Sequence, residues 1–243
     1  MNIDRVSIVI PTLNEEKLIS RALSQYSKEI KDEYNLEIVV SDGGSTDSTL
    51  SRLNGVCDSV ITENLKKQNI ARGRNIGAKN SHGDVLIFFN ADTKVGNMRL
   101  FLDRILDIMK TGRYAAISFK IKVFPEEEKL SDRMFHNFYN NYVRLINKAG
   151  IGMARGECHI LLRKHFENAG GYNENLIAGE DFDLYRRIRK FGKIYYCSDM
   201  PVYESPRRYR AYGYAKVFSQ WAKNAVWIML FNKSYQKSWD PVR

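Results

Sequence analysis

Long hydrophobic runs, cysteine pairs and proline- or glycine-rich linkers are all missing from this 243-residue sequence. The longest apolar block near the C-terminus, residues 225–231, is much shorter than the roughly 18 residues that a membrane-spanning helix needs. The N-terminus passes directly into an apolar segment, Val6–Ile10, without the layout of a signal peptide. The three scattered cysteines favour a reducing compartment. These absences predict a cytoplasmic protein with one continuous domain over residues 1–243.

The positive charge of the chain is unevenly distributed. The formal net charge is +10, and residues 201–243 hold eight Lys and Arg against two acidic residues. A nucleotide diphosphate, an anionic membrane surface or a nucleic acid could each be the partner of such a tail. The alternative is that these residues form an ordinary basic face in contact with solvent. No recognised nucleic-acid-binding motif accompanies the charge, so no nucleic-acid partner is expected.

The first half alternates short β-branched segments with helical patterns. Strands are expected at 6–10, 36–41, 59–62, 85–89 and 115–121, with helices near 15–30, 46–54, 69–80 and 97–111. Such alternation predicts βαβ units, and therefore an α/β fold with a mixed, largely parallel, Rossmann-like sheet flanked by helices. Ligands bind beyond the carboxyl ends of the strands in such sheets. Three polar segments follow apolar runs at these ends: 11–15, 42–47 and 90–93.

The second half has a different pattern. An aromatic-rich helix leads into the glycine-rich stretch 150–156, followed by an expected strand at 159–162, a helix from about 180 to 190 and a last strand at 194–197. Residues 212–231 form a helical pattern with Trp221 and Trp227 among lysines. This helix either packs its tryptophans onto the domain or lies in a membrane interface.

A sharp turn is expected after the second strand. Asp42 and Gly43 begin the sequence Asp-Gly-Gly-Ser-Thr-Asp, in which the glycines let the backbone turn toward a ligand. Asp42 then either accepts hydrogen bonds from a nucleobase or ribose, or caps the following helix.

The end of the fourth expected strand offers a metal ligand. Mg²⁺ or Mn²⁺ is usually held by one or two protein oxygens, with diphosphate and water completing the shell. Asp92 is the first choice, and Asn90 is expected to point the same way because one residue separates them in an extended segment. The alternative is a cap for the helix near 97–111.

Two further groups lie in the second half. Glu180 and Asp181 begin a helix, and a carboxylate projecting from there into a cleft would deprotonate an acceptor hydroxyl. Arg207 and Arg208 follow a proline and suit a diphosphate or a phosphorylated acceptor through bidentate hydrogen bonds. Acids in a first helical turn and an exposed basic turn are the ordinary alternatives.

Taken in order, these segments resemble the family 2 glycosyltransferases, which have the GT-A fold. The resemblance covers about residues 5–210. Within it, the segment 83–92 resembles the one that ends in that family's DxD motif, and 179–181 resembles its acceptor-side ED motif. It implies a nucleotide-sugar-binding half (1–120), an acceptor-side half (121–210) and a basic aromatic C-terminal helix and tail (211–243). The matching segments are 6–16, 39–46, 71–78, 83–92, 170–174, 179–181 and 186–192.

The resemblance also implies an inverting transfer from a UDP- or GDP-linked sugar to a hydroxyl acceptor, with Mn²⁺ or Mg²⁺ as cofactor. Asp92 would bind the metal, and Asp181 would be the general base with Glu180 beside it. The residues that would surround the nucleotide and its diphosphate are Pro11, Leu13, Glu15, Asp42, Gly43, Arg72, Asn75, Asn90, Arg207 and Arg208.

Asn90 departs from the family pattern, because the first position of the DxD motif here lacks a carboxylate. Glu204 lies just before the arginine pair, where some relatives supply a further metal ligand, and is a second candidate. The C-terminal segment resembles relatives that act on lipid-linked or membrane-associated acceptors. A polyprenyl-linked or glycan acceptor at the inner face of the cell membrane is therefore one expectation.

Two other functions stay open. A nucleotidyltransferase also pairs a nucleotide with Mg²⁺, but residues 11–15 lack the glycine-rich basic loop of such enzymes. A non-catalytic nucleotide-sugar-binding module would explain Asn90 as decay of the metal site, although Asp92 and Asp181 are both retained.

Overall fold

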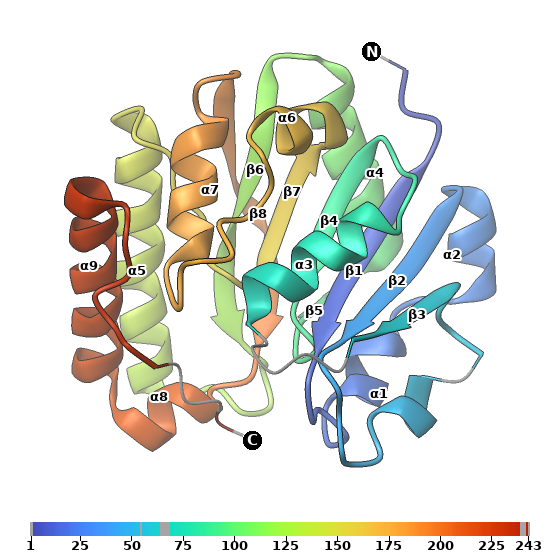
Figure 1. Ribbon diagram of the computed structural model, residues 1–243, viewed down its shortest axis with the longest axis horizontal. Coiled ribbons are helices and arrows are strands. Elements are labelled where there is room, and N and C mark those ends of the chain that lie inside the picture. The colour runs from blue at the N-terminus through green and yellow to red at the C-terminus, as the bar shows by residue number, and fades with distance from the viewer. Residues whose placement is uncertain (1, 54, 64–68, 239–241, 243) are drawn as a thin grey trace.

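One eight-stranded sheet organises the computed structural model, which describes residues 2–53, 55–63, 69–238 and 242. The strand order is β3-β2-β1-β4-β7-β6-β8-β5 (Figure 1). The strands are β1 (Val6–Thr12), β2 (Leu36–Asp42), β3 (Ser59–Thr62), β4 (Val85–Phe89), β5 (Lys94–Val95), β6 (Tyr114–Val123), β7 (Cys158–Leu162) and β8 (Lys193–Glu204).

The sheet is mixed, as the sequence predicts. Strands β3, β2, β1 and β4 are mutually parallel, and β6 is parallel to β8. Strand β7 is antiparallel to both of its neighbours, β4 and β6, and it joins the two halves of the chain into one sheet. The carboxyl ends of β1, β2 and β4 therefore meet at one edge, which is where the polar segments emerge.

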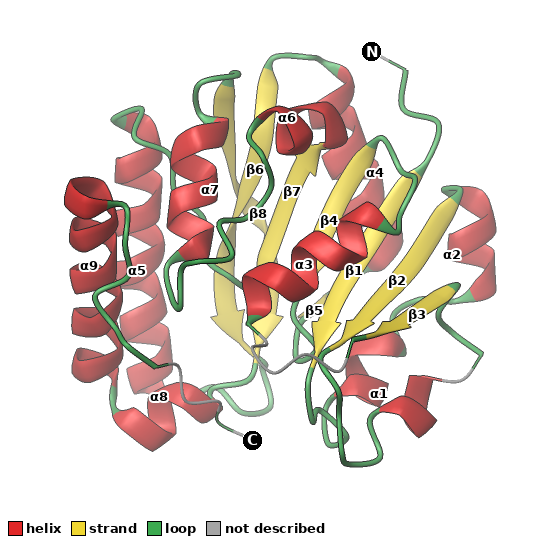
Figure 2. Cartoon of the chain, viewed as in Figure 1, coloured by secondary structure: helices red, strands yellow, loops and turns green. Residues whose placement is uncertain are grey.

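Helices cover both faces of this sheet (Figure 2). Side chains of α1, α2 and α4 pack on one face, and those of α3, α6 and α7 pack on the other. Helices α5 and α9 lie side by side at one end and share a third apolar cluster with α7. The helices are α1 (Ile19–Leu23), α2 (Lys28–Glu33), η1 (Leu50–Leu53), α3 (Ile70–Lys79), α4 (Met98–Lys110), α5 (Leu130–Lys148), α6 (Arg163–Asn168), α7 (Glu180–Ile188), α8 (Arg207–Tyr212) and α9 (Tyr214–Phe231).

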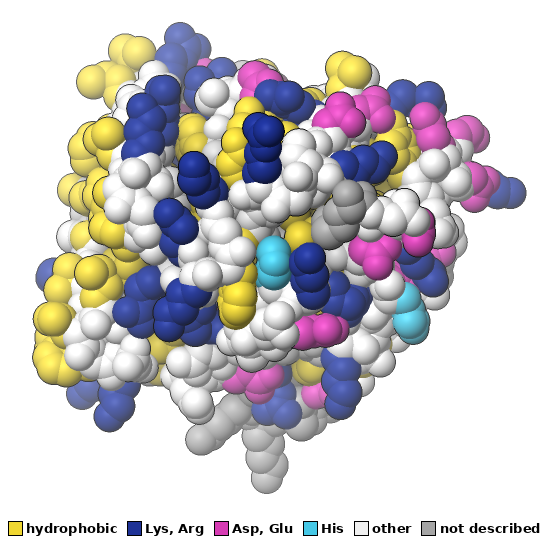
Figure 3. All heavy atoms as spheres, turned by 90° about the horizontal axis from the view of Figure 1, so that it is seen from above, with side chains coloured by type: hydrophobic (Ala, Val, Ile, Leu, Met, Phe, Trp, Pro, Cys, Tyr) yellow, Lys and Arg dark blue, Asp and Glu magenta, His cyan; other side chains and the backbone are white. Residues whose placement is uncertain are grey.

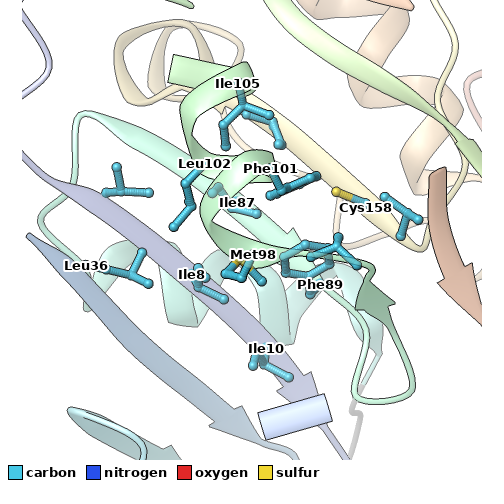
Figure 4. Close-up of a cluster of buried hydrophobic side chains, with 14 of the residues drawn as sticks. Ile8, Ile10, Leu36, Ile87, Phe89, Met98, Phe101, Leu102, Ile105 and Cys158 are labelled. Atoms are coloured by element: carbon cyan, nitrogen blue, oxygen red, sulfur yellow. The ribbon is translucent and has the colours of Figure 1, made fainter. Parts of the chain in front are cut away.

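Alternating side chains of the central strands build the larger core (Figure 4). Ile8 and Ile10 of β1 and Phe89 of β4 are fully buried against Phe101 and Ile105 of α4. On the opposite face, Gly77 lets α3 approach β1 closely, because a Cβ at that position would overlap Val9. This packing fixes the strand ends on which the candidate site is built.

Three expected elements were wrong in extent. The helix expected near 15–30 is two short helices, because the chain breaks after α1 and Ser27 caps α2 by accepting a hydrogen bond from the Ile30 N–H (3.4 Å). The helix expected near 46–54 is only the 3₁₀ turn η1. The strand expected at 194–197 continues to Glu204, which brings that residue to the candidate site.

Candidate active site

A cleft of about 1020 Å³ opens at the carboxyl ends of β1, β2 and β4. It lies where the polar strand ends predicted ligand binding. Asp42 and Asn75 are the two predicted site residues that do not line it. The other twelve do: Pro11, Leu13, Glu15, Gly43, Arg72, Asn90, Asp92, Glu180, Asp181, Glu204, Arg207 and Arg208.

Asp92 faces this cleft just beyond β4. Its side chain is mostly buried, with 13% exposed, and burial is the main reason that its pKa is raised to about 6. Arg207 opposes this rise, whereas the charges of Glu15 and Glu157 add to it. The alternative role as a helix cap is wrong, because Asn97 caps α4 by accepting a hydrogen bond from the Leu100 N–H (3.1 Å).

Arg207 connects the two acidic strand ends. Its guanidinium donates two hydrogen bonds to Glu15 at the end of β1 (3.0 and 2.9 Å) and lies 3.2 Å from Asp92 Oδ2. Arg208 also lines the cleft, and burial lowers its pKa. The two arginines and Asp92 together suit a diphosphate. Arginine side chains bind phosphate oxygens directly, and a carboxylate binds them through a divalent cation.

The carboxylates at the start of α7 point to different partners. Gly179 begins the helix with a left-handed backbone (φ 84°). Asp181 stays partly exposed to the cleft, and its pKa is raised to about 7 by burial and then by the neighbouring charge of Glu180. One of its oxygens accepts a hydrogen bond from the Phe182 N–H (2.7 Å). A carboxyl group that titrates near 7 is well matched to general-base chemistry at neutral pH.

Glu180 instead forms a buried ion pair that the sequence analysis missed. Arg74 of α3 is 1% exposed and donates to Glu180 (2.8 Å), to the Asn90 side-chain oxygen (3.0 Å) and to the Gly156 carbonyl (2.6 Å). The amide of Asn90 and the carboxylate of Glu180, both of which line the cleft, are thus held by one buried cation. The only indication of this role in the sequence was that Arg74 lies inside segment 71–78, which resembles the family.

Replacing Arg74 with methionine is expected to destabilise the fold by about 3–5 kcal/mol, because it leaves Glu180 buried without its cation. Urea unfolding of the purified variant measures this change. Arg72→Met is the matched control, since Arg72 lies on the same helix, is only partly buried and is expected to cost far less. Equal losses for the two variants would contradict the structural role assigned to Arg74.

A second buried cation organises the floor of the cleft. Arg155 is 3% exposed and donates to Glu204 (2.5 Å), Glu157 (3.1 Å) and the Tyr209 hydroxyl (2.7 Å). Glu204 also accepts from Tyr209 (2.7 Å), and its pKa is well above the usual range because of burial and the charge of Glu157. Glu204 Oε1 is therefore occupied by protein donors, which makes it a poor metal ligand. Arg155 lies within the glycine-rich stretch 150–156 and Glu157 directly follows it, and neither was predicted.

The two predicted residues outside the cleft wall support loops. Asp42 is 1% exposed and accepts hydrogen bonds from the N–H groups of Gly44 (2.9 Å) and Ser45 (2.8 Å) in its own turn. Asn75 fixes the start of the loop after Gly171. Its side-chain oxygen accepts from the Tyr172 N–H (2.8 Å) and its amide nitrogen donates to the Tyr172 carbonyl (2.9 Å). Both side chains therefore support loops next to the cleft through hydrogen bonds to the backbone.

The described residues contain no group of three or more His, Cys, Asp and Glu side chains that could hold a metal. A site for Mg²⁺ or Mn²⁺ does not need one, because one carboxylate is enough when a diphosphate supplies further oxygens. Asp92 meets this requirement: it is mostly buried, it lines the cleft, and a nearby cation would favour its ionised form, as the charge of Arg207 already does. The residues present therefore fit a metal that arrives with the donor.

The family profile described as Glycosyl transferase family 2 matches residues 7–170, about two thirds of the chain. The chain belongs to glycosyl transferase family 2. The sequence resemblance is thereby confirmed, and the match ends before the ED segment at the start of α7.

Two curated relatives illustrate the range of this family. The chain is 26% identical over 204 residues to the probable glycosyltransferase YdaM of Bacillus subtilis, covering 77% of this chain and 47% of that protein. It is 37% identical over 91 residues to a Methanococcus voltae enzyme named dolichyl N-acetyl-alpha-D-glucosaminyl phosphate 3-beta-D-2,3-diacetamido-2,3-dideoxy-beta-D-glucuronosyltransferase, covering 35% and 28%. The chain thus spans less than half the length of these relatives.

Solved structures show that the fold is GT-A. The mannosyltransferase PcManGT from Pyrobaculum calidifontis, in complex with GDP-Man and Mn²⁺, superposes with a TM-score of 0.68 at 20% identity, covering 90% of this chain and 64% of that one. S. aureus TarS 1–349 in complex with UDP-GlcNAc gives 0.62 at 19% identity, covering 83% and 58%. No helix in the described part of this chain has the length and apolar character to cross a membrane.

Proposed function

We propose that this protein is an inverting, metal-dependent glycosyltransferase that moves a sugar from a nucleotide-sugar donor to a hydroxyl acceptor. The observation that carries this proposal is the placement of Asp92 and Asp181 on the walls of one cleft, each with a raised pKa. One carboxyl group suits a metal and the other suits a base. The structural neighbour PcManGT is in complex with GDP-Man and Mn²⁺, which supports a nucleotide-sugar donor and a divalent cation.

The donor fits the cleft with its nucleotide toward the strand ends. Pro11, Leu13, Gly43 and Arg72 line the part that would receive the base and ribose. Arg207 and Arg208 would take the diphosphate, which requires Arg207 to exchange part of its contact with Glu15 and Asp92 for phosphate oxygens. A divalent cation bound by Asp92 would offset charge on the leaving diphosphate.

The reaction is a single displacement. Asp181 removes the proton of the acceptor hydroxyl while the oxygen of that hydroxyl forms the new bond to the anomeric carbon. The bond from that carbon to the donor's diphosphate oxygen breaks on the opposite face, so the configuration inverts. The leaving diphosphate carries away the bonding electrons, and the basic side chains near it stabilise that charge.

The acceptor is proposed to be a glycan or lipid-linked hydroxyl at the inner face of the cell membrane. Two relatives support this class by name: the Methanococcus voltae enzyme and a poly(ribitol-phosphate) beta-glucosyltransferase of Bacillus spizizenii, 31% identical over 101 residues. The indole ring of Trp221, which stacks on the buried Tyr139 ring, lines the cleft and offers an apolar contact for a sugar.

Thermal unfolding with a panel of UDP-, GDP-, CMP- and dTDP-sugars, with and without Mn²⁺, tests the donor assignment. One nucleotide family is expected to raise Tm, since a ligand at 100 times its Kd stabilises the native state by about 2.7 kcal/mol. The rise should be larger with Mn²⁺. Inorganic diphosphate with Mn²⁺ is the control for charge alone. If no donor shifts Tm under any condition, the binding site is wrongly assigned.

A further inference from the structure

Helices α5 and α9 expose a broad apolar face at one end of the molecule. Leu130, Met134, Phe138 and Leu145 of α5 are 55–70% exposed and fall on one side of that helix. Figure 3 shows hydrophobic side chains gathered along this edge. The outward residues of α9 continue the face: Val226, Trp227, Met229, Leu230 and Phe231, each 40–67% exposed. We call these nine residues the α5–α9 face.

The two helices hold this face together as one surface. The Phe138 ring packs edge-on against Phe218 of α9 (5.2 Å between centroids), and the hydroxyl groups of Ser131 and Tyr214 are 3.0 Å apart. Beneath them Tyr139 stacks on Trp221 (5.2 Å). Exposed apolar area of this extent on a well-packed pair of helices indicates a binding surface.

Positive charge predominates around this face. Its acidic neighbours all lie at the Leu130 end, where they pair with arginines: Glu126 and Glu127 with Arg21, Glu128 with Arg133, and Asp132 with Arg210. The sequence holds no acidic residue between Arg133 and Gly156 or between Ser205 and Ser238. Five exposed cations stand on α5, on α9 or just after it, and within the described residues none of them is within ion-pair distance of a carboxylate. They are Arg144, Lys148, Lys216, Lys223 and Lys233.

Helix α9 also connects this face to the cleft. Trp221, Asn224 and Ala225 line the cleft from one side of the helix, while Val226 and Leu230 are exposed on the other. Trp221 thus packs onto the domain, as one of the two expectations from the sequence has it, whereas Trp227 is 40% exposed on the other side of the helix. Anything bound on the α5–α9 face lies one helix diameter from the acceptor side of the cleft, about 10 Å.

We propose that the α5–α9 face docks on the surface of an anionic lipid bilayer, with apolar side chains inserted at the headgroup boundary and the cations against lipid phosphates. Exposed aliphatic and aromatic side chains with a predominantly basic border are the pattern of interfacial helices. A second copy fits less well, because a two-fold contact would bring the same cations together. Docking would hold the cleft near a lipid-linked acceptor, and only this purpose rests on the proposed function.

Co-sedimentation with phosphatidylcholine vesicles, with and without phosphatidylglycerol, tests this proposal directly. The full chain is expected to bind the anionic vesicles and to release them at high salt. Leu145→Glu with Leu230→Glu should lower the bound fraction about tenfold or more. Arg144→Glu with Lys148→Glu should weaken binding about fivefold per cation. These residues are exposed, so the variants should keep the wild-type Tm.

Matched controls lie on the other side of the molecule. Leu100 of α4 is 58% exposed and Arg113 follows the same helix, so Leu100→Glu and Arg113→Glu should leave vesicle binding unchanged. Absence of binding to anionic vesicles at low salt would overturn the proposal. So would a dimer in light scattering that the Leu145→Glu and Leu230→Glu pair dissociates, since the face would then belong to a second copy. Donor-induced shifts in Tm do not depend on this face and report on the catalytic proposal separately.

Discussion

Asp181→Asn is expected to lower kcat by about 10²–10⁴-fold while leaving the affinity for the donor nearly unchanged. Asparagine keeps the shape of the side chain and one oxygen for the Phe182 N–H, but it cannot accept the acceptor's proton. Single-turnover transfer measures the chemical step, and the donor-induced shift in Tm measures binding. Asp183→Asn is the matched control, because Asp183 is in the same helical turn but pairs with Arg187 (2.7 Å) and does not line the cleft.

The pH dependence gives a second signature of the same group. The pKa of Asp181 is raised to about 7, so the base is ionised only above that value and the transfer rate should rise through pH 7. Stability should change in the opposite direction. Because the folded state binds this proton more tightly than the unfolded chain does, stability is lost as pH rises from about 4 to 7. Asp181→Asn should remove that loss and raise Tm by a few degrees at pH 8.

These results would be hard to obtain from a residue with a merely structural role, since the variant is expected to be more stable and less active. If Asp181→Asn retains most of the wild-type rate, the base is elsewhere. Glu157 would be the next candidate, because it lines the cleft and its charge acts on both Asp92 and Asp181.

The strand ends of the candidate site could be predicted from sequence because they depend on local pattern. The segments 59–62 and 85–89 were placed with their observed bounds, since short β-branched and apolar runs bounded by polar turns are typical of strands, whether partly exposed as in β3 or buried as in β4. Asp92 and Gly43 follow such runs. Because the carboxyl ends of parallel strands lie at one edge of a sheet, the two residues were predicted to lie near each other there.

The buried cations could not be predicted in the same way. Arg74 and Arg155 are almost fully enclosed, and each depends on a partner far along the chain: Glu180 is 106 residues from Arg74, and Glu204 is 49 residues from Arg155. An arginine in a helical pattern is normally solvated, and only the assembled fold pairs it with a carboxylate. The extension of β8 to Glu204 was also missed, because Pro201 weakens the strand pattern after Cys197.

Asp92→Asn is expected to abolish the effect of Mn²⁺ on donor binding and to lower the transfer rate about 10²–10³-fold. The variant keeps an oxygen near the diphosphate but loses the charge that would hold the cation, and loss of one electrostatic contact to a leaving group has costs of this order. Donor titrations monitored by Tm, with Mn²⁺ and then with excess EDTA, measure the metal response without turnover. Asp107→Asn, which removes an exposed carboxylate from α4, should behave as wild type.

Glu204→Gln separates the two predicted metal ligands. Burial and the charge of Glu157 raise the pKa of Glu204 well above its usual range, which favours the neutral acid, and glutamine keeps an oxygen for Arg155 and Tyr209 without a charge. The response to Mn²⁺ should therefore survive Glu204→Gln and disappear in Asp92→Asn. If both substitutions remove the response, Glu204 ionises and leaves Arg155 when the metal binds. If only Glu204→Gln removes it, the metal lies on the β8 side of the cleft and Asp92 serves mainly to hold Arg207.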